Sequence, residues 1–133
     1  MSQSLIIYID DDQAITLALD NYFKSRKYEI EFLNEYDSDT FIKFLQEKKP
    51  RIIIVDDDLN GETHYAHIAQ DVKRAFAGTD HKIHLIGCTG EETDLKSMKR
   101  NYKNEGYYDF LPNNGEPKQL DLICAVIDKI FTL

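Results

Sequence analysis

The chain has 133 residues and a formal net charge of −8, and 42% of its residues are hydrophobic. This length has room for one domain, so residues 1–133 are expected to fold as a single unit. The acidic balance argues against nonspecific binding to nucleic acid and against an anionic membrane surface, because both interactions need a basic surface. The hydrophobic content argues against a disordered chain.

The first half of the chain alternates between strand and helix patterns. Residues 5–9 are apolar on both faces, which is typical of a buried parallel strand, and residues 52–55 repeat this pattern. Residues 28–32 alternate apolar side chains with glutamates, as a half-buried strand does. Between these strands, apolar residues at helical spacing predict two helices. Asp12 is expected to cap the first helix, and residues 38–40 are expected to start the second.

The second half continues the same alternation. Residues 65–76 have helical spacing and precede an apolar strand at residues 83–86. A further helical pattern ends at Gly106, and residues 107–111 predict the fifth strand. Pro117 suits the first position of a last helix. Five strand–helix units in this order predict an α/β fold with a doubly wound parallel sheet and helices on both faces, a three-layer sandwich.

Two runs of three aspartates, residues 10–12 and 56–58, each follow a buried strand. In doubly wound sheets, ligands bind at the carboxyl ends of the strands, which is where both runs would lie. Crowded carboxylates repel one another, and a bound cation relieves that repulsion. A divalent ion that prefers oxygen ligands, such as Mg²⁺, is therefore expected at this edge.

The six aspartates are not expected to have the same role. A functional role is the better interpretation for Asp10, Asp11 and Asp56. For Asp12 and Asp57, helix capping or exposure to solvent is the better interpretation.

These motifs resemble those of the receiver domains of response regulators in two-component signalling. Residues 6–15 (IIYIDDDQAI) resemble the first strand and acidic pair of that family, and residues 50–56 (PRIIIVD) resemble its third strand. Residues 90–94 (GEETD) resemble the start of its fourth helix. The resemblance spans nearly the whole chain and implies the flavodoxin-like fold of five strand–helix units.

The resemblance also implies a chemistry. Mg²⁺, with Ca²⁺ or Mn²⁺ as alternatives, would be held by Asp10, Asp11, Asp56 and the backbone carbonyl of Asp58. The Asp56 carboxylate would accept a phosphoryl group from a sensor histidine kinase or a phosphotransfer protein. The chain would then signal to a downstream protein target, with neither nucleic acid nor a membrane as partner. No enzymatic activity is expected beyond its own phosphorylation and dephosphorylation.

Some positions depart from the family's pattern. Counting back from residues 90–92 puts Gly87 where the family has a Thr or Ser that contacts the phosphoryl group, and Thr89 could substitute only if the strand register differs. Asn113 stands where the family has a lysine, while Phe110 matches its switch aromatic. An alternative interpretation is therefore a pseudo-receiver, an interaction module that signals without phosphorylation.

Two further alternatives depend on the aspartate runs. Residues 10–12 and 56–58 each contain an Asp-x-Asp pair, which fits in outline the nucleophile motif of haloacid-dehalogenase-type phosphatases, but the Gly-Thr continuation is missing. Residues 56–61 (DDDLNG) match the opening of an EF-hand calcium loop. The twelfth position of that loop is His67 rather than Glu, and a strand rather than a helix precedes it.

Two other groups of residues suggest binding sites. Glu62, His64 and His67 could be zinc ligands, although no fourth ligand is evident and surface histidines are the simpler interpretation. A basic stripe on the fourth helix is either a solvated face or a docking patch. It consists of Lys96, Lys99, Arg100 and Lys103.

The N-terminal segment and the cysteines indicate a compartment. Residues 1–4 contain no basic residue, and the apolar run at residues 5–9 is too short for a signal peptide or a membrane span. Cys88 and Cys124 both lie in apolar stretches, as buried thiols in a reducing environment do. The chain is therefore expected in the cytoplasm.

Overall fold

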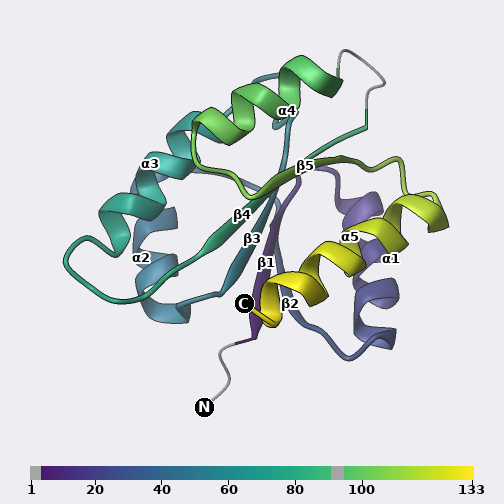
Figure 1. Ribbon diagram of the computed structural model, residues 1–133, viewed down its shortest axis with the longest axis horizontal. Coiled ribbons are helices and arrows are strands. Elements are labelled where there is room, and N and C mark those ends of the chain that lie inside the picture. The colour runs from purple at the N-terminus through teal and green to yellow at the C-terminus, as the bar shows by residue number, and fades with distance from the viewer. Residues whose placement is uncertain (1–3, 91–94) are drawn as a thin grey trace.

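The computed structural model describes residues 4–90 and 95–133 (Figure 1). In this part of the chain, five parallel strands form one sheet in the order β2-β1-β3-β4-β5. The strands are β1 (Leu5–Ile9), β2 (Glu29–Leu33), β3 (Ile52–Asp56), β4 (His84–Thr89) and β5 (Asp109–Pro112). The helices are α1 (Gln13–Ser25), α2 (Ser38–Lys48), α3 (Tyr65–Ala75), α4 (Leu95–Asn104) and α5 (Pro117–Phe131). Residues 91–94, which belong to the predicted start of the fourth helix, lie outside the described residues.

The helices cover both faces of the sheet, which confirms the predicted three-layer sandwich (Figure 1). Helices α1 and α5 lie on one face, and α2, α3 and α4 lie on the other. Successive side chains of a strand point to opposite faces. In β1, Ile6 and Tyr8 therefore pack with α1 and α5, whereas Ile7 and Ile9 pack with the other three helices. Because both faces are covered, the central strands are apolar on both sides.

The predicted helix boundaries are confirmed at three points. Gly106 has a φ of 96° and follows the last turn of α4, a left-handed conformation that glycine adopts without strain. Pro117 is the first residue of α5. Asp12 caps α1, and its side chain accepts hydrogen bonds from the backbone N–H groups of Ala14 and Ile15 at 3.0 and 3.1 Å.

The start of α2 lies within the predicted residues 38–40, at Ser38, but its cap is the preceding residue. The Asp37 side chain accepts a hydrogen bond from the backbone N–H of Thr40 at 3.1 Å. This bond and one from the Thr40 hydroxyl lower the pKa of Asp37. Sequence reasoning missed this cap because three capping residue types stand next to it.

The Asp12 cap leads to a testable difference between two substitutions. Asp12→Asn and Asp12→Ala both remove the negative charge near the aspartate runs, but only Asn keeps a side-chain oxygen for the first turn of α1. We expect Asp12→Ala to be less stable than Asp12→Asn by about 1 kcal/mol. Urea unfolding of the two variants would measure this difference. Equal stabilities would show that the cap contributes nothing.

Several strand boundaries differ from the predictions by one to three residues. Strand β2 begins and ends one residue later than predicted. Strand β4 runs to Thr89 rather than to residue 86, because Gly87 and Thr89 continue the ladder to Phe110 and Pro112 of β5. Strand β5 begins at Asp109 rather than at residue 107. The backbone N–H of Tyr107 instead bonds the carbonyl of Tyr102 at 3.1 Å, which closes the end of α4.

Among the described residues, no helix combines the length and the apolar character needed to cross a membrane.

Candidate functional site

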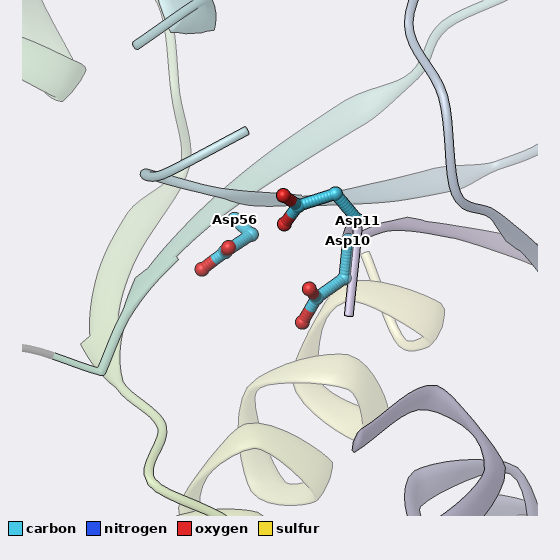
Figure 2. Close-up of side chains that lie close together, drawn as sticks. All are labelled: Asp10, Asp11 and Asp56. Atoms are coloured by element: carbon cyan, nitrogen blue, oxygen red, sulfur yellow. The ribbon is translucent and has the colours of Figure 1, made fainter. Parts of the chain in front are cut away.

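The ends of β1 and β3 bring three aspartates together. The two strands are neighbours in the sheet, so Asp10 and Asp11, which follow β1, lie beside Asp56, the last residue of β3. One carboxylate oxygen from each of the three residues lies within 4.8 Å of the other two, and Figure 2 shows the three side chains close together. Asp10 is buried, and the other two are half-buried. The structure therefore brings together the three aspartates that the sequence singled out.

These aspartates lie in a cavity of about 340 Å³ at the carboxyl edge of the sheet. The lining residues are Tyr8, Asp10, Asp11, Asp12, Ile15, Asp56, Asp57, Asp58, Thr89, Gly90 and Asn113. Both aspartate runs contribute all their members, and none of these described lining residues is Lys, Arg or His. The cavity is therefore strongly electronegative and suited to a cation.

Burial and mutual repulsion disfavour the charged forms of two of these carboxyl groups. Burial, followed by the charges of Asp10, Asp11, Asp58 and Asp57, raises the pKa of Asp56 to about 8. The pKa of Asp10 rises to about 6, mainly through burial, although a hydrogen bond from the backbone N–H of Asp12 lowers it. A divalent cation would favour the ionised forms of both groups.

Backbone and amide groups hold the first aspartate pair in place. The backbone N–H of Asp12 donates to Asp10 Oδ1 at 3.0 Å, and Asn34 Nδ2 donates to the carbonyl of Asp10 at 2.8 Å. Asp11 Oδ2 accepts from the backbone N–H of Asn60 at 2.9 Å, which ties the loop after β3 to the end of β1. The sequence did not predict this role of Asn34. The only local indication is that a polar residue directly follows β2.

The other members of the aspartate runs have separate contacts. Asp12 caps α1, and Asp57 Oδ1 accepts a hydrogen bond from the Tyr102 hydroxyl at 2.5 Å. Asp58 Oδ1 accepts from the backbone N–H of Gly61 at 2.7 Å, so this side chain shapes the loop after β3. The role of its backbone carbonyl as a metal ligand stays a prediction.

The extended β4 changes which residue faces the site. Asp56 pairs with Cys88 in the ladder between β3 and β4, so the strand reaches Thr89 at the edge of the cavity. Thr89 is 3% exposed and lines the cavity, whereas Gly87 does not. The strand thus ends two residues after Gly87, and which of Gly87 and Thr89 would meet a phosphoryl group stays a prediction.

The asparagine at the family's lysine position is engaged in local hydrogen bonds. Asn113 Nδ2 donates to the Tyr8 hydroxyl at 2.6 Å, and Asn113 Oδ1 accepts from the backbone N–H of Gly115 at 3.0 Å. The backbone N–H of Asn113 bonds the carbonyl of Thr89 at 2.8 Å. These contacts join the loop after β5 to β1 and β4 at the cavity.

Phe110, at the position of the switch aromatic, is 3% exposed. Its ring centroid lies 4.3 Å from that of Tyr102, and it belongs to the core cluster on the face of α2, α3 and α4. Burial and the hydrogen bond to Asp57 raise the pKa of Tyr102, so its hydroxyl stays protonated and acts as a donor.

The other predicted sites do not form clusters of the same kind. Within the described residues, Glu62, His64 and His67 are not among the groups of three close metal-ligating side chains. His64 Nε2 lies 3.5 Å from Glu62 Oε2, and the two histidine ring centroids are 6.5 Å apart. In the basic stripe on α4, Lys99 pairs with Asp109 at 3.0 Å. The other three members of the stripe are exposed.

Solved structures with the same fold include three bacterial response regulators. A two-component response regulator from Clostridium difficile matches with a TM-score of 0.74 at 17% identity, over 98% of this chain and 97% of that one. A response regulator from Thermotoga maritima matches with a TM-score of 0.73 at 17% identity, over 99% and 100%. A response regulator from Burkholderia pseudomallei with a phosphorylated aspartic acid, a calcium ion and citrate matches with a TM-score of 0.71 at 17% identity, over 93% and 66%.

These likenesses establish the fold of the chain. It is the flavodoxin-like fold of response regulator receiver domains, and the matches cover nearly the whole chain. No protein-family model matches the sequence, and no curated protein matches it in sequence.

Proposed function

We propose that this chain is a receiver of two-component signalling that accepts a phosphoryl group on Asp56 in a Mg²⁺-dependent reaction. The observation that carries the proposal is the convergence of Asp10, Asp11 and Asp56, with oxygens within 4.8 Å of one another, at the carboxyl edge of a receiver fold. Receiver domains work through these residue types at these positions, so fold and site support the same function.

The residues fit a hard divalent cation. The side chains of Asp10, Asp11 and Asp56 offer only oxygen atoms as ligands. Burial, followed by repulsion among the carboxylates, raises the pKa of Asp10 and Asp56, and a cation would relieve that repulsion. These three side chains and the backbone carbonyl of Asp58 would hold Mg²⁺, with Ca²⁺ or Mn²⁺ as alternatives. The bound ion would supply positive charge against the phosphoryl oxygens.

The chain's own contribution is an ionised, positioned nucleophile. An oxygen of the Asp56 carboxylate forms the new bond to phosphorus as the bond from phosphorus to the donor's leaving group breaks. Thr89 lines the same cavity, and we assign its hydroxyl to a phosphoryl oxygen. Asn113 has no charge to offer, and its amide bonds Tyr8 and Gly115.

The partners follow from this function. A sensor histidine kinase or a phosphotransfer protein would donate the phosphoryl group, and a downstream protein would recognise the phosphorylated chain. Both encounters would take place in the cytoplasm.

A second function is favoured by one observation. The described residues that line the cavity include no cation, and Asn113 is held by Tyr8 and Gly115. A phosphoryl group on Asp56 would therefore lack the lysine contact that this family uses. A pseudo-receiver that signals through binding alone would tolerate this loss.

Intact mass distinguishes the two functions. After incubation with a small-molecule phosphodonor and Mg²⁺, we expect the wild-type chain to gain one phosphoryl group, because Asp56 becomes an ionised nucleophile beside the cation. Chelation of Mg²⁺ should prevent the gain, and Asp56→Asn should abolish it. Asp39→Asn, an exposed change in the first turn of α2, is the matched control and should behave as wild type. No gain at any Mg²⁺ concentration would favour the pseudo-receiver.

A further inference from the structure

The aromatic residue Tyr102 occupies an unusual position between α4 and the aspartate cavity. It comes from α4, yet it is only 1% exposed. Its ring stacks on Tyr65 of α3 at 4.1 Å with an interplanar angle of 18°, and it meets Tyr107 edge-on at 4.8 Å and 78°. The ring therefore lies in the core between α3, α4 and β5, and neighbouring rings restrict its motion.

The space for this ring exists because residue 87 is a glycine. A Cβ atom at Gly87 would lie 2.4 Å from Cδ2 and Cε2 of Tyr102 and 2.7 Å from Cδ1 of Phe110. Contacts this short cannot form without displacing one of the rings. Gly87 lies in the middle of β4, where no turn requires a glycine, so its role is to admit Tyr102.

The polar end of Tyr102 reaches the phosphoacceptor segment. Its hydroxyl donates to Asp57 Oδ1 at 2.5 Å, and Asp57 lines the cavity directly after Asp56. The neighbouring Tyr107 is also buried, but its hydroxyl donates to the backbone carbonyl of Tyr65 at 2.8 Å instead. Of these two buried phenols, only Tyr102 connects α4 to an aspartate of the cavity.

We propose that Tyr102 is a positioning residue that couples cation binding in the aspartate cavity to α4 by holding the Asp57 carboxylate. While Asp57 Oδ1 accepts the hydrogen bond from the neutral Tyr102 hydroxyl, the Asp57 carboxylate interacts less strongly with a cation in the cavity. A bound cation attracts the Asp57 carboxylate and thereby weakens its hydrogen bond to Tyr102. Because Tyr102 belongs to α4, the loss of this bond changes how α4 is held against the site. The inference rests on the proposed metal site, but not on phosphorylation itself.

The linkage is reciprocal: if cation binding weakens the bond, removing the bond must strengthen cation binding. Tyr102→Phe keeps the ring in the Gly87 space and removes only the hydroxyl, so Asp57 becomes free to turn toward the cavity. We expect this variant to bind Mg²⁺ at least about fivefold more tightly than wild type, as measured by calorimetry. In an Asp57→Asn background, Tyr102→Phe should have no such effect, because the carboxylate is gone.

Tyr107→Phe is the matched control for structural damage. It removes a buried phenol hydroxyl from the same aromatic cluster but leaves Asp57 and its partner in place, so its Mg²⁺ affinity should equal that of wild type. A second measurement follows the ring itself. The chain has no Trp and eight Tyr, so a near-ultraviolet difference spectrum on Mg²⁺ addition reports on tyrosine environments. This difference should be present in wild type and in Tyr107→Phe and reduced in Tyr102→Phe.

The outcomes separate the coupling from the metal site. If wild type binds Mg²⁺ but Tyr102→Phe and Tyr107→Phe bind it equally well, the coupling is overturned and the metal site stands. The same holds if Tyr102→Phe tightens binding equally in the Asp57→Asn background. If wild type binds no Mg²⁺, both the proposed metal site and the coupling fail.

Discussion

Gly87→Ala is expected to destabilise the protein by about 1–3 kcal/mol, although it adds only one methyl group. The added Cβ would lie 2.4 Å from two ring atoms of Tyr102, and that ring is stacked against Tyr65 and packed on Phe110. Alanine is otherwise better than glycine within a strand by about 0.5–1 kcal/mol, because glycine loses more backbone entropy on folding. Repulsion from Tyr102 therefore outweighs this gain, and the free energy of unfolding falls.

A double-mutant cycle tests this cause by urea unfolding. Tyr102→Ala removes the ring and should itself be costly, since it leaves a cavity in the core. In that background, Gly87→Ala should be neutral or stabilising, because the added methyl group now enters open space. If Gly87→Ala costs the same free energy in both backgrounds, the glycine is not explained by Tyr102.

The stability of the metal-free protein should fall as the pH rises from about 4 to about 8, the range between the ordinary pKa of an aspartate and that of Asp56 in the fold. In this range the folded state binds more protons than the unfolded state, so the free energy of unfolding decreases with pH. Asp10 contributes to the lower part of the range, up to about pH 6. Above about pH 8, neither group adds further pH dependence.

Mg²⁺ should reverse this trend, since it binds the ionised carboxylates and displaces their protons. At 100 times its dissociation constant, a ligand that binds only the folded state stabilises it by about 2.7 kcal/mol. Because part of the binding energy is spent on removing protons at low pH, the stabilisation by a fixed Mg²⁺ concentration should grow between about pH 6 and about pH 8. Thermal unfolding with Mg²⁺ and with a chelator across this range measures it.

Asp56→Asn supplies the control for this pH dependence. The variant lacks the Asp56 carboxyl group, whose pKa is raised more than that of Asp10. Its metal-free stability should therefore change little between about pH 6 and about pH 8. At the upper end of this range it should be more stable than metal-free wild type, because one buried charge is gone. It should also lose most of the Mg²⁺ effect. A wild-type stability that rises through this pH range without metal would contradict the assignment.

Much of the architecture was predictable from the sequence because its signals are local. Alternating buried strands and helical stripes indicate parallel strands with helices on both faces, and the structure has that order. The meeting of Asp10, Asp11 and Asp56 was predictable for the same reason, since parallel strands end at the same edge of the sheet. The cap at Asp12 and the first helical position at Pro117 also followed from single residues and their neighbours.

The end of β4 was not predictable in this way. Counting back from residues 90–92 along the motif of the family placed Gly87 at the end of this strand. The structure continues the ladder to Thr89, which lines the cavity. The strand end depends on backbone pairing with β3 and β5, and the space beside Gly87 is filled by Tyr102, a residue fifteen positions away on another element.

The sequence by itself determined the layered fold, the location of the site and the three carboxylates that define it, because strand periodicity and strand ends are local properties. The tertiary structure decided how the site is connected: Tyr102 donates a hydrogen bond to Asp57, and Asn113 donates one to Tyr8. These contacts join residues that are distant along the chain. They depend on which side chain fills each space in the packed core, and no local pattern encodes that choice.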